Sequence, residues 1–314
     1  MIELVLSVLT AIGSTLGIVD EPHISQPLYA TPVAFAADAQ TISRVRGLPQ
    51  SADREVILIK DVRLPLEDIN AQSAMVVDDA SQTIMYEYNA DVVLPYASLT
   101  KLATALTFVG TEVDLDSEIE IIEDDVIEDR SAIQAGDVLT HRDLLGLALV
   151  GSSNSAAHTL MRASGFTSEY FIGRMNQVTQ ELGLSNSRFV GPTGLDSGNT
   201  GTARDAYKLL QAALDHKDLR DVLGKSEYVF SNGTATKKVF STNAFKIGVL
   251  PFEGDTIIGA KTGYIPAAGF HFAMEAVDNN GDIRQVIVMG APDHYARFTE
   301  AERLLLWAET PNKE

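Results

Sequence analysis

Segments typical of β-strands lie near both ends of this chain, and segments with helical spacing fill the region between them. Residues 73–90 are predicted to form a hairpin, because two runs rich in β-branched and aromatic residues flank the turn residues Asp78 to Ser81. Towards the other end, the stretches 255–278 and 282–292 are expected to form strands of one antiparallel sheet, and 298–309 a closing amphipathic helix. This order predicts an α+β fold, since alternating βαβ units would interleave strands and helices.

The middle of the chain is predicted to be a helical block. The expected helices are 98–109, 141–150, 155–164, 168–184 and 202–214. Helix 98–109 is apolar on more than one side, so we expect it to be buried. Thr202 is the expected N-cap of the last of these helices.

Composition narrows the classes of partner and chemistry. At 314 residues, the chain can hold one large domain or two small ones. Its net charge of −19 argues against a nucleic-acid partner and against charge-driven docking on anionic lipid. It has no cysteine, which excludes disulfides, thiolate catalysis and cysteine-ligated metals.

An acid-rich stretch, 114–129, raises the question of a metal site. The spacing of its carboxylates matches no calcium-binding loop. A solvated strand and loop edge is therefore the favoured interpretation. We expect neither a metal nor a cofactor in this protein.

One S-x-x-K pair, Ser98 and Lys101, lies where the first predicted helix begins. One helical turn apart, the two side chains would share a face. The simple interpretation is a serine N-cap followed by a surface lysine. The alternative is a nucleophile with its base, because a helix N-terminus favours a developing alkoxide. Burial would also lower the pKa of the lysine, as a general base requires.

Two further clusters raise the weight of that alternative. Ser152 and Asn154 form an S-x-N between two predicted helices, and 261–263 reads K-T-G on a β-rich run. Each alone has a structural explanation, as a helix cap or a strand edge. In the order S-x-x-K, S-x-N, K-T-G, the three match the known signature of β-lactamases and penicillin-binding proteins.

From about residue 69 to 307, the chain resembles the serine-type D-alanyl-D-alanine carboxypeptidases, the low-molecular-mass penicillin-binding proteins. The resemblance lies in stretches that include "LPYASLTKLATAL", "GDVLTHRDLLGLALVGSSNSAA", "GPTGLDSGNTGTARDAYKLL" and "GAKTGYIPAAGF". It implies a β-lactamase/DD-peptidase-like fold, with an antiparallel sheet flanked by helices and a helical subdomain. It also implies removal of the terminal D-Ala from peptidoglycan stem peptides that end in D-Ala-D-Ala, and inhibition by β-lactams.

The same resemblance implies roles for individual residues. The expected catalytic residues are Ser98 as nucleophile, Lys101 as its base and Ser152 as proton relay to the leaving amine. The expected substrate-binding residues are Asn154, Lys261, Thr262, Gly263 and Tyr264. Among these, Lys261 would supply positive charge near the substrate carboxylate and help to keep Lys101 neutral. Thr262 would bind that carboxylate, and the backbone N–H groups of Ser98 and Tyr264 would form the oxyanion hole.

The chain departs from the family pattern at two places. Ser153 stands where glycine is common, which adds bulk next to the pocket, and the frequent C-terminal β-rich domain and amphipathic anchor are missing. The expected division is a signal peptide or membrane anchor, a linker, a catalytic domain and a tail, at 1–36, 37–65, 66–310 and 311–314. The apolar stretch 4–19 predicts export to the outer face of the cytoplasmic membrane, the periplasm or the cell wall, with any membrane attachment through this segment.

Other readings of the signature remain open. Class A β-lactamases position their deacylating water with a glutamate followed four residues later by an asparagine. No glutamate lies between Ser187 and Asp205, so rapid β-lactam hydrolysis is disfavoured. A non-catalytic β-lactam sensor usually carries a large membrane domain, for which 314 residues leave no room. Hydrolysis by a classical catalytic triad is disfavoured, because no G-x-S-x-G occurs. We expect His141 and His158 to be structural rather than catalytic. The sequence leaves carboxypeptidase and DD-endopeptidase action both open.

Overall fold

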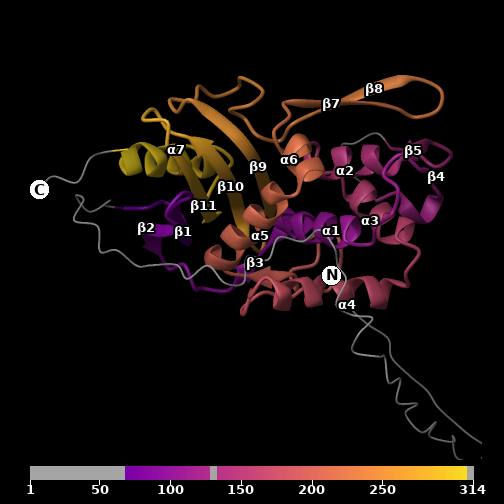
Figure 1. Ribbon diagram of the computed structural model, residues 1–314, viewed down its shortest axis with the longest axis horizontal. Coiled ribbons are helices and arrows are strands. Elements are labelled where there is room, and N and C mark those ends of the chain that lie inside the picture. The colour runs from indigo at the N-terminus through magenta and orange to yellow at the C-terminus, as the bar shows by residue number, and fades with distance from the viewer. Residues whose placement is uncertain (1–67, 128–132, 310–314) are drawn as a thin grey trace, which may run out of the picture. The chain divides into compact units, whose positions relative to one another are not determined.

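The computed structural model describes residues 68–127 and 133–309. Their centre is a five-stranded antiparallel sheet in the order β2-β1-β11-β10-β9, so strands from both ends of the chain pair in one sheet (Figure 1). The strands are β1 Ser73–Asp78, β2 Thr83–Tyr88, β9 Thr256–Ile265, β10 Gly269–Val277 and β11 Ile283–Ala291. The predicted α+β class, the hairpin and the two later strand regions are confirmed.

The predicted helices are present, with small changes at their ends. They are α1 Thr100–Val109, α2 His141–Leu149, α3 Asn154–Ala163, α4 Ser168–Glu181, α5 Ala203–Asp215 and α7 Ala296–Glu309. Thr202 caps α5 as expected, because its side chain accepts a hydrogen bond from the backbone N–H of Asp205.

Several short elements complete the fold, and most of them were not predicted from the sequence. They are β3 Leu94–Pro95 paired with β6 Thr200–Gly201, β4 Glu118–Glu120 with β5 Val138–Thr140, β7 Glu227–Ser231 with β8 Thr236–Phe240, the helix α6 Lys217–Leu223, and the 3₁₀ turns η1 Ala97–Leu99 and η2 Glu123–Asp125.

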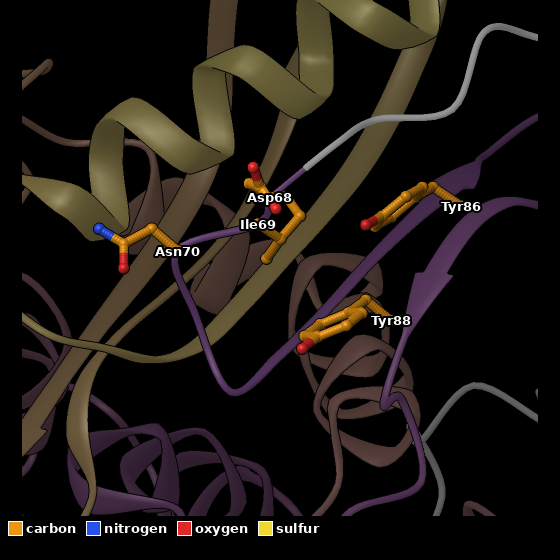
Figure 2. A pocket seen from close by; sticks show the side chains of 5 residues that line it. All are labelled: Asp68, Ile69, Asn70, Tyr86 and Tyr88. Atoms are coloured by element: carbon orange, nitrogen blue, oxygen red, sulfur yellow. The ribbon is translucent and has the colours of Figure 1, made fainter.

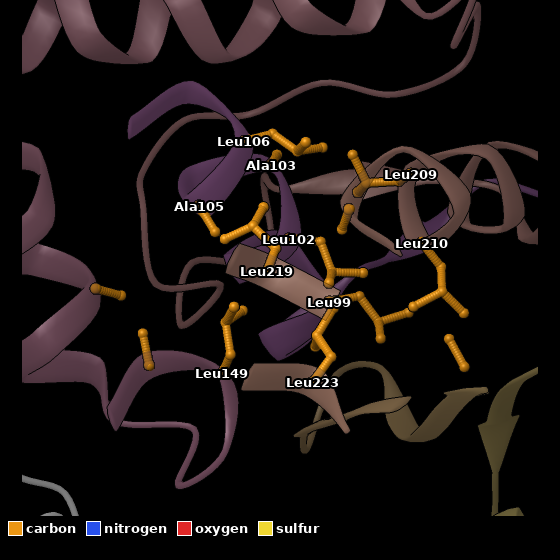
Figure 3. Close-up of a cluster of buried hydrophobic side chains, with 14 of the residues drawn as sticks. Leu99, Leu102, Ala103, Ala105, Leu106, Leu149, Leu209, Leu210, Leu219 and Leu223 are labelled. Carbon is orange, nitrogen blue, oxygen red and sulfur yellow. The ribbon is translucent and has the colours of Figure 1, made fainter. Parts of the chain in front are cut away.

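Two hydrophobic cores lie on opposite faces of the sheet. On one face, α7 buries Phe298, Leu304 and Leu305 against side chains such as Val286 and Phe272. On the other face, leucines of α1, α5 and α6 form a continuous cluster, in which α1 is central (Figure 3). Nine of the ten residues of α1 are buried, so the expectation that this helix is apolar on more than one side is confirmed. A helix enclosed in this way holds its N-terminal residues in fixed positions.

Among residues 68–127 and 133–309, no helix combines the length and the apolar character needed to cross a bilayer. The expectations for 1–36, for the linker 37–65 and for the tail 311–314 fall outside the described residues, so they stay predictions.

Candidate active site

Ser98 lies in the tight turn η1 between β3 and α1. Ala97, just before it, has a φ of 48°, in the left-handed region that non-glycine residues rarely adopt. Tyr96 anchors the turn, since its backbone N–H donates to the carbonyl of Asn199 at 2.7 Å. Helix α1 begins at Thr100, and its N-cap, Leu99, makes no side-chain cap. The simple interpretation of Ser98 as a helix N-cap is therefore wrong.

Lys101 lies in the first turn of α1 and is fully buried. Its Nζ donates to Oγ of Ser98 at 2.9 Å, to Oδ1 of Asn154 at 2.8 Å and to the carbonyl of Thr193 at 2.7 Å. The predicted partnership with Ser98 is thus present as a direct hydrogen bond. The interpretation of Lys101 as a surface lysine is wrong.

The S-x-N motif lies in the connection between α2 and α3. Ser152 has a φ of 60°, a strained conformation for a residue with a side chain. Its Oγ accepts a hydrogen bond from Nζ of Lys261 at 2.8 Å. Asn154 is the first residue of α3 and turns its side-chain oxygen to Lys101. The motif therefore contacts both lysines of the signature.

Ser153 is the N-cap of α3, because its Oγ accepts a hydrogen bond from the N–H of Ala156 at 3.0 Å. It is 1% exposed and does not line the cavity beside Ser98. The expectation that this departure from glycine adds bulk to the pocket is therefore wrong. The interpretation of 152–154 as a helix cap is correct for Ser153 alone. Ser152 and Asn154 instead contact Lys261 and Lys101.

The K-T-G segment lies in β9, the strand beside the nucleophile turn. Lys261 is buried, and its pKa is lowered well below the usual value, first by burial and then by the positive charges of Lys101 and Arg297. The side-chain oxygen of Thr262 lies 2.5 Å from that of Thr242. The charges of Lys101 and Arg297 thus disfavour the charged form of Lys261, whereas Lys261 was expected to carry the positive charge that keeps Lys101 neutral.

Gly263 allows β9 to approach the turn of Ser98. A Cβ atom at this position would lie 3.2 Å from the carbonyl of Tyr96 and 3.3 Å from the backbone nitrogen of Ser98. A side chain here would require the turn or the strand to shift by a few tenths of an ångström. This close approach brings the backbone of Ser98 alongside the residues that precede Tyr264. The oxyanion hole expected from these two residues stays a prediction.

A cavity of about 750 Å³ opens next to Ser98. The predicted site residues that line it are Ser98, Ser152, Thr262, Gly263 and Tyr264. Lys101 and Lys261 lie behind this surface and hydrogen-bond to the hydroxyl groups of Ser98 and Ser152. Asn154 lies beside them and hydrogen-bonds to Lys101. The structure therefore brings all eight predicted site residues together around one cavity.

Arg297, at the start of α7, is a cation of this cavity that the sequence analysis did not find. It is 4% exposed, and its Nη1 donates to the carbonyl of Gly263 at 3.2 Å. Burial lowers its pKa to about 10. The guanidinium lies over the rings of Phe270 and Phe298, which compensates part of the lost hydration. Nothing in the sequence near Arg297 indicates its position, since α7 is far from the motifs along the chain.

Two other contributions were missed in the sequence for different reasons. Thr193 contributes only its backbone carbonyl, which residue identity does not reveal. The β7–β8 hairpin lines the cavity with Lys238, Val239 and Phe240. Its turn contains Asn232 followed by glycine, the strongest short-range hairpin signal, so this element could have been predicted.

His271 binds the backbone just before the turn of Ser98. This fully buried side chain lies on β10 opposite Gly263. Its Nδ1 lies 2.8 Å from the backbone N–H of Gly290, which donates to it, so Nε2 carries the proton and donates to the carbonyl of Pro95 at 2.8 Å. Burial lowers the pKa of His271 to about 4, so the imidazole is neutral at pH 7. The sheet is thereby tied to the residues that precede the nucleophile.

The other candidate features are structural. Nδ1 of His141 lies 2.8 Å from the carbonyl of Asp114, and His158 lies beside the buried ion pair of Asp125 with Arg162. The described part of the acid-rich stretch forms β4 and η2, as the favoured interpretation expected. Within the residues that the structure describes, no three histidine, aspartate or glutamate side chains are arranged to hold a metal ion.

A second cavity, of about 380 Å³, lies beside strand β2 (Figure 2). It is lined by Asp68, Ile69, Asn70, Tyr86 and Tyr88. None of these residues belongs to the predicted site. The signature residues converge on the cavity of Ser98 alone.

Comparison with known proteins identifies the family. A sequence profile for the D-alanyl-D-alanine carboxypeptidases of peptidase family S11 matches residues 60–293. The chain belongs to this family. As a member of peptidase family S11, the protein is a hydrolase. The resemblance inferred from the three motifs is confirmed.

Relatives within the family carry two different activities in their names. The chain is 34% identical over 248 residues to a D-alanyl-D-alanine endopeptidase of Escherichia coli, covering 77% of this chain and 78% of the relative. It is 32% identical to an endopeptidase of the same name from Pseudomonas aeruginosa, covering 79% and 80%. It is 29% identical to D-alanyl-D-alanine carboxypeptidase DacC of Escherichia coli, covering 76% and 61%.

Solved structures agree on the fold. The Streptomyces K15 DD-transpeptidase superposes with a TM-score of 0.71 at 24% identity, covering 78% of this chain and 98% of that one. A D-alanyl-D-alanine carboxypeptidase from Mycobacterium tuberculosis gives the same TM-score at 24% identity, covering 82% and 97%. The expected DD-peptidase-like fold is confirmed.

Proposed function

We propose that this S11 family member is a serine DD-peptidase that hydrolyses the D-alanyl bond of peptidoglycan stem peptides through an acyl-enzyme on Ser98. The observation that carries the proposal is the 2.9 Å hydrogen bond between Oγ of Ser98 and the buried amine of Lys101. A nucleophile paired directly with a buried base is the arrangement that activates a serine hydroxyl.

Acylation begins when Oγ of Ser98 attacks the carbonyl carbon of the penultimate D-Ala. Its proton passes to Lys101, which must be neutral at that moment, as its complete burial favours. Backbone N–H groups of Ser98 and Tyr264 stabilise the oxyanion. The C–N bond then breaks, and the proton that Lys101 took from Ser98 is relayed to the leaving nitrogen by the hydroxyl of Ser152, which accepts a 2.8 Å hydrogen bond from Lys261.

The positive end of the cavity selects a substrate with a carboxylate on its leaving group. Arg297 supplies the charge, and Thr262 supplies a hydroxyl in the same cavity. We expect Asn154 to bind the backbone of the acyl part. A water molecule completes the cycle by attacking the ester, which releases the shortened peptide and restores Ser98.

The same acyl-enzyme serves two substrates that differ only in the leaving amine. A carboxypeptidase releases terminal D-Ala, whereas an endopeptidase releases the side-chain amine of a second, cross-linked stem peptide. Carboxypeptidase action is supported by the description of the family whose profile matches residues 60–293. Endopeptidase action is favoured by the relatives at 34% and 32% identity, which match over about four fifths of their own length.

β-Lactams should acylate Ser98, because their strained amide resembles the D-Ala-D-Ala bond. The adduct should clear slowly, since the 187–205 segment lacks the glutamate that class A β-lactamases use for deacylation. A substrate in the cell wall also requires that the protein act outside the cytoplasm. We propose that residues 1–36 direct its export.

Mass spectrometry of the purified protein incubated with a pentapeptide ending in D-Ala-D-Ala, and with a cross-linked peptide dimer, tests the proposal. We expect loss of one alanine from the pentapeptide, cleavage of the dimer, or both, and neither with Ser98→Ala. Absence of both reactions in the wild-type protein would refute the assignment.

A further inference from the structure

The cavity of Ser98 continues past the K-T-G strand along residues 240–249. Thr242, Ile247 and Val249 from this segment line it together with Phe240. The hydroxyl of Thr242 lies 2.5 Å from that of Thr262, so the segment adjoins the residue proposed to bind the leaving-group carboxylate. This wall therefore lies on the leaving-group side of the site.

The wall exposes large apolar side chains inside the cavity. Phe240 is 56% exposed, Ile247 39% and Val249 57%. They follow one another along a single segment and line a single cavity, unlike apolar residues scattered singly over a surface. Apolar side chains grouped on a concave wall are typical of ligand contacts.

The cavity is also larger than a terminal D-Ala requires. Its volume of about 750 Å³ falls within the range that encloses drug-sized ligands. A single alanine held at Thr262 and Arg297 would leave the side chains of Ile247 and Val249 in water. A leaving group that carries its amine on a hydrocarbon side chain would cover them.

We propose that Phe240, Ile247 and Val249 form a leaving-strand subsite that binds the second stem peptide of a cross-link. The inference rests on the proposed DD-peptidase function and names the substrate that the site prefers. Contacts of this subsite exist only with a cross-linked substrate. They raise the rate of cross-link cleavage relative to the release of terminal D-Ala.

The test compares two activities of the same preparation: cleavage of a cross-linked peptide dimer and release of D-Ala from the matching pentapeptide. Val249→Ser and Ile247→Ser remove apolar contacts in the subsite. Val229→Ser is the matched control, because Val229 has a similar exposure of 54% but lies on β7 and does not line the cavity. Fluorescent penicillin labelling of Ser98 in the wild type reports on the proposed function separately.

We expect each subsite variant to lower the ratio of dimer to pentapeptide kcat/KM by roughly tenfold, the low end of the effect of lost hydrocarbon contacts in a binding pocket. The control should keep the wild-type ratio. An unchanged ratio in both subsite variants, or a wild type that releases D-Ala but leaves the dimer intact, overturns the subsite while the DD-peptidase function stands. A wild type with neither activity and no labelling of Ser98 overturns both.

Discussion

Replacement of Gly194 by alanine should separate the loop around Thr193 from the turn of the nucleophile. Gly194 has a φ of 83°, and an added Cβ would lie 2.4 Å from the carbonyl carbon of Ala97 and closer still to its oxygen. Both obstacles are backbone atoms that cannot rotate away. Because Thr193 accepts a hydrogen bond from Lys101, a shift of this loop also moves the base.

The expected cost has two parts. A left-handed conformation costs an alanine about 1–2 kcal/mol. Overpacking against rigid neighbours adds about 1–3 kcal/mol. The free energy of unfolding should therefore fall by about 2–5 kcal/mol, which corresponds to roughly 4–20 °C in melting temperature for a domain of this size.

Two other glycines provide controls. Gly165 has a φ of 74° and open space at its Cβ position, so Gly165→Ala should incur only the conformational cost. Gly191 has open space and no left-handed φ, so Gly191→Ala should be neutral. Differential scanning calorimetry gives the melting temperatures, and stopped-flow acylation by a β-lactam gives the rates. The reasoning is refuted if Gly194→Ala matches Gly165→Ala in melting temperature and matches the wild type in acylation.

Three further predictions follow from single contacts. Lys101→Arg should stay folded by circular dichroism yet slow β-lactam acylation by roughly 100- to 10,000-fold, because arginine cannot give up its proton near neutral pH; acylation at the wild-type rate would contradict the role of base. The pKa of His271 in the folded protein, about 4, lies below the usual 6.5. Its contribution to the free energy of unfolding is therefore complete above pH 6.5, and about 3 kcal/mol of it is lost as the pH falls towards 4. In urea titrations from pH 7 to 4, the free energy of unfolding should fall less steeply with pH in His271→Gln than in the wild type. Equal slopes in the two proteins would contradict this role of His271. Ser153→Ala should cost about 1 kcal/mol in urea denaturation through loss of the α3 cap, and an unchanged midpoint would argue against that cap.

The sequence predicted the elements with regular periodicity and missed those that tertiary contacts create. Helix α1 was expected to begin at Ser98 but begins at Thr100, because Ala97 adopts a strained φ and the chain turns there. The sequence has no glycine at this position to indicate the turn. That strain persists because the Tyr96 and Pro95 backbones are held by Asn199 and His271. None of these long-range contacts leaves a local pattern in the sequence.

The candidate site was predictable where side chains form a known signature. Ser98, Lys101, Ser152 and Lys261 were identified because their motifs match a known signature, and the structure links them in two hydrogen-bonded pairs. Arg297 was not, because its place in the cavity depends on how α7 packs against the sheet. The wall at 240–249 was missed for a similar reason, since the sequence does not show which exposed apolar residues line a common cavity.

The central claim, that Ser98 is the acylated nucleophile, is tested most directly by mass spectrometry of the protein after reaction with benzylpenicillin. We predict a mass increase of one penicillin per chain, located by peptide mapping on the fragment that contains Ser98 and absent from a folded Ser98→Ala variant. An adduct on another residue, or an equal adduct on Ser98→Ala, would contradict the account.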